Sequence, residues 1–270
     1  MNAKGNVLIT GVSSGIGQAT AQLLDQRGFT VFGTSRNRDG VATPGVHMLP
    51  LDVCLNQSVE ACVSAVLKES GRLDILINNA GYAFIGAIEE AALEEAKSQF
   101  ETNFFGVMRM VEAVLPIMRK QGSGQIINVS SLVGIAPLPF AGYYSASKFA
   151  LEGFTEALRH EVKPFNIKVS LVEPAFIKTN FMRNRQLAVN HISDYDPWRK
   201  RVSDTVGQRE ADGAEPTLVA ECIGHIVESK SPGLRYPIGK GAARVVRMRR
   251  FFPESLFEKG IRRSFRLDSA

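Results

Sequence analysis

A tyrosine and a lysine stand four residues apart in the segment YSASK, from Tyr144 to Lys148. On a helix this spacing puts both side chains on one face. A phenol there can donate a proton, and an ammonium one turn away should lower the pKa of Tyr144 below its usual value of about 10. Such a pair suits the interconversion of an alcohol and a carbonyl. Taken alone, the same spacing is more often a surface pair.

Two polar residues earlier in the chain are candidates for the same reaction centre. Ser131 ends the apolar run QIINVSS, and Asn103 lies in a long helical pattern. A hydroxyl at Ser131 can hydrogen bond a carbonyl oxygen and stabilise the negative charge that develops on it. Each has a structural alternative: Ser131, with its neighbour Ser130, could cap a turn, and Asn103 could be a helix N-cap.

Apolar runs that alternate with amphipathic stretches must position these residues. We expect strands at 6–10, 30–35, 46–53, 73–79, 125–131, 167–174 and 234–239. We expect helices at 15–28, 56–70, 92–121, 143–163 and 216–229. Apolar strands separated by helices predict a parallel sheet with helices on both faces and right-handed crossovers. The expected fold is one doubly wound α/β domain of the Rossmann type, with about seven strands, over residues 1–270.

A glycine-rich turn, TGVSSGIG, follows the first expected strand and opens the first expected helix. Its glycines allow a tight turn and a close approach to a pyrophosphate, and the helix N-terminus offers free N–H groups to phosphate. The spacing G-x-x-x-G-x-G differs from the commoner dinucleotide fingerprint, so that a purely structural turn is the alternative. The cofactor contacts expected here are Gly11, Ser13, Ser14, Gly15, Ile16 and Gly17.

The end of the second expected strand bears on the choice between NAD and NADP. In doubly wound folds an acidic residue at this point often holds the ribose hydroxyls. Here the strand ends at Ser35, and Arg36 and Arg38 follow. No carboxylate repels a 2′-phosphate, and a guanidinium can pair with one. We predict NADP(H) as the preferred cofactor and NAD(H) as the alternative; the other interpretation of these arginines is a solvated surface.

Five motifs in order resemble the short-chain dehydrogenase/reductase family over residues 5–240. They include the glycine turn, NNAG at 78–81, and Ser131 thirteen residues before Tyr144. The resemblance implies a catalytic tetrad of Asn103, Ser131, Tyr144 and Lys148. It also implies cofactor contacts by Asp52, Val53, Asn79, Ala80, Gly81, Pro174, Ala175, Ile177 and Thr179, besides Ser35, Arg36, Tyr144 and Lys148.

The resemblance also implies roles for the tetrad in carbonyl reduction by NADPH. Tyr144 would donate the proton, and Ser131 would bind the carbonyl oxygen. Lys148 would lower the pKa of Tyr144 and bond the nicotinamide ribose, while Asn103 would help to hold a water that links Lys148 to solvent. One departure is Ala175, which stands where the family usually has glycine after a proline. Because alanine restricts the backbone, we expect a slightly different geometry at the nicotinamide end without loss of activity.

Apolar residues near the expected site indicate a lipophilic substrate. The candidates are Phe84, Ile85, residues 135–142, Phe176, Phe181, Met182 and Trp198. The last four lie in a polar, irregular stretch at 176–213, which we expect to be a lid with short helices. The chain is most similar to the branch of 17β-hydroxysteroid and retinol dehydrogenases and bacterial reductases, which implies a steroid-like, retinoid-like or otherwise apolar carbonyl or alcohol. The alternative is that these residues are core.

Composition limits the location and the partners. The chain has 44% apolar and 22% charged residues, no signal-peptide pattern and no apolar run long enough to span a membrane. Three cysteines, Cys54, Cys62 and Cys222, are too few for a disulfide framework or a zinc site. We therefore expect a cytoplasmic protein with reduced cysteines and no metal.

The net charge of +5 is concentrated in the C-terminal segment 240–270, which holds nine lysines and arginines against three carboxylates. The rest of the chain is slightly acidic, which argues against a nucleic-acid partner. The sequence VVRMRRFF interleaves arginine with phenylalanine and could face a membrane surface or an acidic partner. A solvated helix face, or pairing within an oligomer, is the interpretation we favour for this basic tail.

Two expectations about assembly and activity remain. The stretch FFGVMRMVEAVLPIM is more apolar than one buried face requires, and relatives pair through the helices expected at 92–121 and 144–164, so we expect a homodimer or homotetramer. The leading function is an NADP(H)-dependent oxidoreductase. The alternatives are an isomerase or epimerase that retains its cofactor and a non-catalytic regulator that senses NADP.

Overall fold

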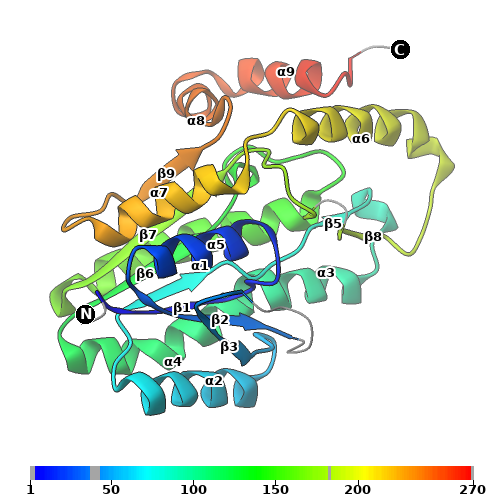
Figure 1. The fold of residues 1–270 in the computed structure, drawn as a ribbon. Coiled ribbons are helices and arrows are strands. Elements are labelled where there is room, and N and C mark those ends of the chain that lie inside the picture. The colour runs from blue at the N-terminus through cyan, green and yellow to red at the C-terminus, as the bar shows by residue number, and fades with distance from the viewer. Residues whose placement is uncertain (1–3, 37–42, 182–183, 269–270) are drawn as a thin grey trace.

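A seven-stranded parallel sheet forms the centre of the molecule, in the order β3-β2-β1-β4-β6-β7-β9 (Figure 1). The computed structural model describes residues 4–36, 43–181 and 184–268. All pairings within the sheet are parallel, and helices cover both of its faces. The predicted doubly wound α/β fold is confirmed.

The strands begin and end close to their expected positions. Those of the large sheet are β1 (Asn6–Ile9), β2 (Thr30–Ser35), β3 (Val46–Pro50), β4 (Ile75–Asn78), β6 (Gly124–Val129), β7 (Ile167–Pro174) and β9 (Arg235–Ile238). A small parallel pair joins β5 (Phe84–Ile85) to β8 (Gln186–Leu187). The strand expected at 46–53 stops at Pro50, because its partner β2 ends opposite, at Ser35.

Two apolar layers hold the helices on the sheet. The helices are α1 (Gly15–Gln26), α2 (Asn56–Ser70), α3 (Leu93–Phe100), α4 (Gly106–Gln121), α5 (Gly142–Glu161), α6 (Asp196–Ala211), α7 (Pro216–Glu228), α8 (Ala242–Phe251) and α9 (Glu254–Ser264). Successive strand residues point to opposite faces, so that Leu8 packs toward α2 and α4 while Val7 and Ile9 pack toward α1 and α7.

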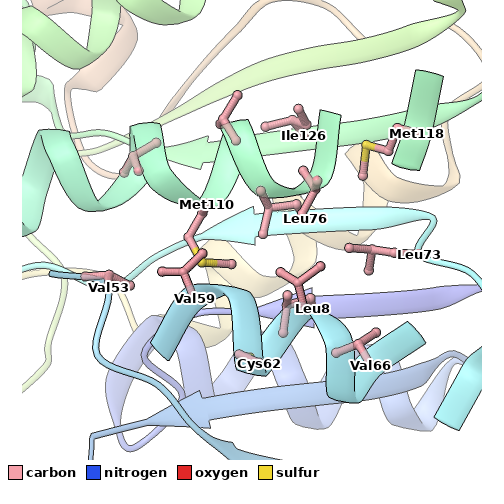
Figure 2. Packing of buried hydrophobic residues seen from close by; sticks show 14 of the residues in the cluster. Leu8, Val53, Val59, Cys62, Val66, Leu73, Leu76, Met110, Met118 and Ile126 are labelled. Atoms are coloured by element: carbon pink, nitrogen blue, oxygen red, sulfur yellow. The ribbon is translucent and has the colours of Figure 1, made fainter. Parts of the chain in front are cut away.

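The apolar layer between the sheet and the helices α2 and α4 shows why these two segments are helical (Figure 2). Val59, Cys62 and Val66 recur at helical spacing along α2 and face Met110 of α4 across the buried cluster. Cys62 is an unpaired thiol, as predicted, and its burial raises its pKa to about 12. This cluster holds α2 and α4 against one face of the sheet, whose strands β1, β4 and β6 end at a common edge.

The helical pattern expected at 92–121 is interrupted in the structure. Five residues, Glu101–Phe105, form a π-helical turn between α3 and α4. A π turn adds a residue to the helix and rotates the side chains that follow. Asn103 lies in this turn and is fully buried, so that it is not a helix N-cap.

The described part of the basic C-terminal segment is folded. It forms α8 and α9, which lie at the outer end of the molecule beyond β9 and α6 (Figure 1). Along residues 4–36, 43–181 and 184–268, no helix is both long and apolar enough to cross a membrane.

Candidate active site

One pocket at the carboxyl ends of β1, β4, β6 and β7 contains most of the predicted site residues. Parallel sheets of this kind bind ligands at that edge. The pocket is lined by Gly11, Ser13, Ser14, Gly15, Ile16, Ser35, Arg36, Asp52, Val53, Asn79, Ala80, Gly81, Ser131, Tyr144, Lys148, Pro174, Ala175, Ile177 and Thr179. Gly17 and Asn103 lie behind its wall instead, and Arg38 falls outside the described residues.

The glycine turn leaves no room for side chains. Gly11 and Gly15 have φ angles of 71° and 60°, in the region that favours glycine. A Cβ on Gly11 would lie 2.9 Å from the Cα of Ala80, and one on Gly17 would lie 2.2 Å from the carbonyl oxygen of Gly11. The turn is therefore a cradle of bare backbone at the start of α1, which fits the pyrophosphate of a dinucleotide.

Asn79 and Thr10 hold this turn in place. The amide of Asn79 donates to the carbonyl oxygens of Thr10 at 3.0 Å and Gly11 at 2.8 Å. The hydroxyl of Thr10 accepts from the backbone N–H groups of Asn79 at 2.9 Å and Ala80 at 3.0 Å. Asn79 thus shapes the cradle as well as lining the pocket. Thr10 is not recognisable from the sequence, because a threonine at the end of a buried strand has no distinctive spacing.

The end of the pocket next to β2 and β3 is lined by residues that were predicted to contact the cofactor. Arg36 is exposed at the end of β2, and Ser35 beside it is buried. The carboxylate of Asp52 accepts from the N–H of Cys54 at 2.9 Å, and the N–H of Asp52 donates to the Ser58 hydroxyl at 2.9 Å. These bonds fix the loop after β3, with Asp52 facing the pocket.

Ala175 follows β7 without strain. Its φ is not positive, and its N–H donates to the carbonyl oxygen of Ile238 at 2.8 Å. A residue in ordinary extended or helical backbone does not need to be glycine. The difference from the family pattern at this position therefore costs the fold nothing.

Tyr144 and Lys148 are both buried on the face of α5 that points into the pocket. The ammonium of Lys148 donates to the carbonyl oxygen of Val129 at 2.9 Å. Burial lowers the pKa of Lys148 to about 8, although the carboxylate of Glu152 raises it. Lys148 is thus held between the end of β6 and its own helix, one turn from Tyr144.

The phenol of Tyr144 differs from the sequence prediction in its ionisation. Burial raises its pKa to about 12, and the Ser131 hydroxyl beside it lowers it only in part. We had expected Lys148 to bring this pKa below its ordinary value. Burial sets the direction instead, because the phenolate is the charged form and is penalised by desolvation. Tyr144 therefore keeps its proton at neutral pH.

Ser131 both caps a turn and lines the pocket. Its hydroxyl accepts from the N–H of Val133 at 3.3 Å and lies 3.5 Å from the carbonyl oxygen of Pro174, to which it donates. The cap interpretation is therefore right, and it fixes the hydroxyl next to Tyr144. Ser130 is buried close to Glu152, where its hydroxyl lowers the pKa of that carboxyl against the effect of burial.

Asn103 does not line the pocket but hydrogen bonds Tyr82 and Ser147 behind it. Its amide oxygen accepts from the N–H of Tyr82 at 3.1 Å, and its amide nitrogen donates to the carbonyl oxygen of Tyr82 at 3.0 Å and to the Ser147 hydroxyl at 3.3 Å. These bonds tie the π turn to α5 and to the loop after Gly81. Gln99 holds the same loop, since it accepts from the N–H of Phe84 at 2.7 Å. The sequence analysis did not identify Gln99.

A buried charge cluster lies one helical turn beyond Lys148. Arg235 of β9 pairs with Glu152 and Glu156 of α5 and with Glu173 of β7. Glu152 and Glu173 are buried, and burial together with the neighbouring carboxylate raises the pKa of Glu173 to about 7. One guanidinium thus balances two buried carboxyl groups at the end of β7.

The wall of the pocket beyond Tyr144 is apolar. It contains Val133, Ala136, Leu138, Phe176, Phe181, Val245, Ile261 and Phe265. The rings of Tyr144 and Phe181 lie 5.7 Å apart. Phe176, Phe181 and part of 135–142 therefore line the pocket as predicted, whereas Phe84 packs on Tyr143 at 6.2 Å and is core.

Other predicted pocket residues lie elsewhere. Trp198 is exposed, with the guanidinium of Arg201 5.3 Å from its ring, and Ile85 is half-buried outside the pocket lining. Met182 falls outside the described residues. In their place the C-terminal helices supply Val245 and Ile261.

Arg209 of α6 joins the lid to α9. It donates to the carbonyl oxygen and the hydroxyl of Ser264 at 2.8 and 2.6 Å, and its guanidinium lies 4.7 Å from the ring of Phe265 and 5.8 Å from that of Phe176. Burial lowers the pKa of Arg209, which lines the pocket. The repeat of Phe257, Ile261 and Phe265 at four-residue spacing is the sequence signal that could have identified α9 as part of this wall.

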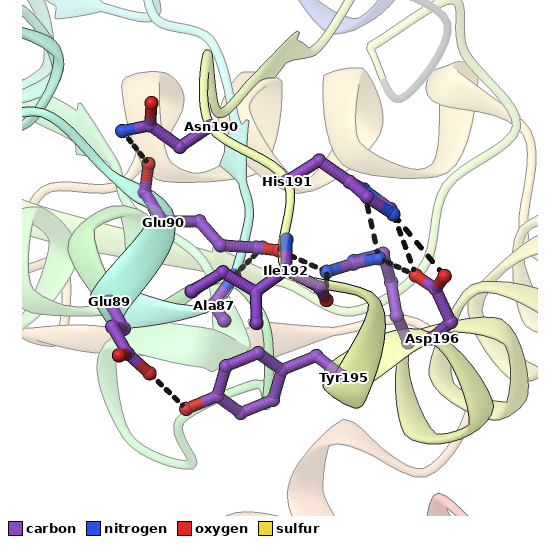
Figure 3. Close-up of polar contacts among 9 residues, drawn as sticks. Ala87, Glu89, Glu90, Asn190, His191, Ile192, Tyr195 and Asp196 are labelled. Carbon is purple, nitrogen blue, oxygen red and sulfur yellow. Dashed lines mark hydrogen bonds and ion pairs between the residues drawn. The ribbon is translucent and has the colours of Figure 1, made fainter.

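The middle of the predicted lid is anchored by Glu90 (Figure 3). The Glu90 carboxylate is buried and accepts from the N–H groups of Ala87 and Ile192, each at 2.8 Å, and it pairs with Arg199 of α6. Burial alone would raise the pKa of Glu90, but these donors outweigh it, and the pKa is lowered. The described part of 176–213 is folded, and its helix α6 is longer than the short helices expected. That this segment acts as a lid stays a prediction.

Comparisons with known proteins agree with this architecture. A family model described as short chain dehydrogenase matches residues 5–190. The 3-ketodihydrosphingosine reductase of Bacteroides thetaiotaomicron is 45% identical over 86% of this chain and 87% of its own length. The human retinol dehydrogenase 8 is 35% identical over 85% of this chain and 79% of its own length.

Solved structures give the same fold. A short-chain dehydrogenase from Streptomyces avermitilis superposes with a TM-score of 0.83 at 30% identity, over 100% of both chains. A 3-ketoacyl-(acyl-carrier-protein) reductase from Brucella melitensis complexed with NADH has a TM-score of 0.76 at 25% identity, over 89% of this chain and 99% of its own. ElxO with NADP bound has a TM-score of 0.72 at 25% identity, over 86% and 96%. These neighbours include complexes with both dinucleotides.

Proposed function

The chain belongs to the short chain dehydrogenase family, and from that premise we propose that it is an NADP(H)-dependent reductase of long-chain, lipid-like ketones. Its membership makes it an oxidoreductase of the short-chain dehydrogenase/reductase type. The observation that carries the proposal is a single pocket in which the glycine cradle, the Ser131–Tyr144–Lys148 group and an apolar wall are continuous. The finer points of cofactor, substrate and chemistry follow.

Tyr144 is the proton donor in this proposal. When bound, NADPH would supply the hydride that reduces the carbonyl carbon. The Ser131 hydroxyl hydrogen bonds the carbonyl oxygen, on which negative charge grows. Tyr144, which is protonated at neutral pH because burial raises its pKa to about 12, donates its proton to that oxygen. Lys148, one turn away, stabilises the phenolate that is left.

NADP(H) rather than NAD(H) is proposed on the residues at the end of β2. The Arg36 guanidinium is exposed at the rim of the pocket, and Ser35 stands where a carboxylate would bind ribose hydroxyls. An arginine can pair with a 2′-phosphate through two parallel hydrogen bonds.

A long apolar substrate is proposed on the composition of the pocket wall. Beyond Tyr144 the pocket has apolar lining from Leu138, Phe176, Phe181, Ile261 and Phe265, with the Arg209 guanidinium over the rings of Phe176 and Phe265. The relative that reduces 3-ketodihydrosphingosine, a long-chain ketone, has 45% identity with this chain. We therefore propose 3-ketodihydrosphingosine as the first substrate to test and retinoid-like carbonyls as the second.

Homodimer formation is proposed through the surface of the π turn and α5. Phe105 and Phe149 are exposed there, on segments that pack together through Phe104 and Phe154. Exposed aromatic residues on adjacent helices are typical of a subunit interface. Sedimentation velocity of wild type and of Phe149→Ser tests this, and a wild-type monomer at micromolar concentration would contradict it.

Cofactor titration tests the dinucleotide site without any substrate. NADPH and NADH are titrated into wild type and Arg36→Ala, with cofactor fluorescence as the signal. We expect tighter binding of NADPH than of NADH by wild type, and loss of most of this difference in Arg36→Ala. Arg119→Ala, an exposed arginine at the far end of α4, is the matched control and should bind as wild type does. NADH binding as tight as NADPH binding would overturn the cofactor assignment.

A further inference from the structure

The junction of α8 and α9 exposes apolar side chains that the proposed reaction does not use. Phe251, Phe252 and Leu256 are 71%, 49% and 51% exposed there. We call the surface formed by Arg244, Arg247, Arg250, Phe251, Phe252, Leu256, Lys259 and Arg263 the C-terminal corner. Both helices lie at the outer end of the molecule (Figure 1). Exposed aromatic residues grouped in this way mark an interaction surface.

The cations of the C-terminal corner are not neutralised by the protein. Arg244, Arg247 and Arg250 recur every three residues along the exposed side of α8. Within the described part of the chain, none of the three forms an ion pair with a carboxylate. Arg249 on the inner side, by contrast, pairs with Glu254 at 2.6 Å and lies 5.0 Å from the ring of Phe257. The charge left over therefore points outward.

Aromatic rings and cations alternate on this surface. The guanidinium of Arg250 lies 5.5 Å from the ring of Phe251. Helices that lie in a membrane interface combine basic residues, which meet lipid phosphates, with apolar side chains that enter the acyl boundary. The C-terminal corner has both in one place, on two successive short helices.

The same helices form the wall of the substrate pocket. Val245 of α8 and Ile261 of α9 line the pocket, as does Phe265 just after α9. The outer sides of α8 and α9 thus carry the C-terminal corner, while their inner sides face the proposed lipid ketone. An apolar substrate that leaves a bilayer at this corner has only the thickness of one helix layer to cross.

We propose that the C-terminal corner docks on an anionic lipid bilayer, with Phe251 and Phe252 at the acyl boundary and the arginines on lipid phosphates. The path of substrate from bilayer to pocket rests on the proposed function, but docking itself needs neither substrate nor cofactor. A second copy of the chain fits this surface poorly, because a two-fold contact would bring the same arginines against each other.

Vesicle co-sedimentation of the full chain tests the docking. The vesicles are equimolar phosphatidylcholine and phosphatidylglycerol, or phosphatidylcholine alone. The variant Arg250→Gln/Phe251→Ser removes one cation and one ring from the corner. Each surface cation contributes about fivefold to partitioning onto an anionic membrane. With the loss of the phenylalanine, we expect at least about tenfold weaker binding to the anionic vesicles.

A matched control exists elsewhere on the molecule. Arg119 and Phe165 form the same kind of pair, with the guanidinium 5.9 Å from the ring and Phe165 40% exposed. Arg119→Gln/Phe165→Ser should bind anionic vesicles as wild type does, and neutral vesicles should bind all three proteins weakly. Added salt should weaken wild-type binding, because it screens the arginines. Thermal unfolding checks that both variants fold.

Three results would overturn the proposal. The first is the absence of wild-type binding to anionic vesicles. The second is equal binding by wild type and the corner variant. The third is a smaller oligomer for Arg250→Gln/Phe251→Ser in sedimentation velocity, since the corner would then contact a second copy. Vesicle binding that persists while no lipid ketone is reduced would uphold the docking and contradict only the proposed substrate.

Discussion

At the scale of single residues, burial acts on the two ionisable groups of the site in opposite directions. It raises the pKa of Tyr144 to about 12 and lowers that of Lys148 to about 8. Both shifts favour the neutral form of the group. A protonated phenol is the state that carbonyl reduction needs, whereas alcohol oxidation needs the phenolate. Tyr144 therefore carries, near neutral pH, the proton that reduction requires.

The ionisation of Lys148 should appear in the pH profile of reduction. The ammonium stabilises the tyrosinate, and it is lost as pH rises through the pKa of Lys148, about 8. We expect kcat/KM for reduction, which reports ionisations of the free enzyme, to fall above that pH. Lys148→Arg keeps its charge across this range. Its profile should stay flat there, even at a lower rate, and a fall at the same pH in this variant would contradict the assignment.

The cluster around Arg235 leads to a prediction about stability. Arg235→Met would leave Glu152 and Glu173 buried against each other without the guanidinium that pairs with both. Removing one partner of a buried ion pair typically costs about 3–5 kcal/mol of unfolding free energy. Glu173 has a raised pKa of about 7 in the folded chain, so its proton is bound below that pH and lost above it. Stability contributed by this proton is therefore present at low pH and declines as pH rises through about 7.

Urea unfolding of Arg235→Met and wild type at mildly acidic and mildly alkaline pH measures this effect. The loss of unfolding free energy in Arg235→Met should be larger at alkaline pH, where both carboxyl groups tend to ionise. Glu173→Gln, which keeps the shape and removes the charge, is the control and should reduce the pH dependence. If the loss of unfolding free energy in Arg235→Met did not change with pH, packing and not charge would be the cause of the lost stability.

At the scale of elements, the sequence predicted the alternation of strands and helices because each carries a clear period. The π turn at Glu101–Phe105 was not predictable, since its residues continue the helical pattern and the turn depends on bonds from Asn103 to Tyr82. The end of β3 depends on where its partner β2 stops. Both features come from contacts distant in sequence, which a local pattern does not contain.

The glycine turn was predictable because its geometry is local. A Cβ on Gly17 would overlap the carbonyl oxygen of Gly11, at 2.2 Å. We expect Gly17→Ala to weaken NADPH binding by at least about tenfold, because the turn must open to admit the Cβ and a loss of about 1.4 kcal/mol in binding is already tenfold. Isothermal titration of the two proteins with NADPH measures the change.

Gly207 provides the matched control for that substitution. It lies within α6, and a Cβ there would meet no atom within 4 Å. Gly207→Ala should leave NADPH affinity unchanged and raise the unfolding free energy by about 0.5–1 kcal/mol, because alanine is the better helix former. Normal NADPH binding by Gly17→Ala would contradict the cradle described for the turn.

At the scale of the whole molecule, the site joins segments from both ends of the chain. It was predictable that most residues of the proposed reaction group and cofactor site would line one pocket, because their motifs stand in a fixed order along residues 5–190, the range that the family model matches. The pocket wall was predicted only in part. Phe176 and Phe181 line it, but Arg209, Ile261 and Phe265 reach it through the packing of α6 and α9, which no spacing near the motifs reveals.

In the proposed reaction, Tyr144 protonates a long-chain ketone that NADPH reduces. The most direct measurement is NADPH oxidation with 3-ketodihydrosphingosine in mixed micelles, by wild type, Tyr144→Phe and Tyr143→Phe. Loss of a general acid costs about 10²–10⁴ in rate, and we expect such a loss for Tyr144→Phe. Tyr143 packs on Phe84 outside the pocket, so Tyr143→Phe should turn over nearly as wild type does. Turnover by Tyr144→Phe close to that of wild type would contradict the mechanism.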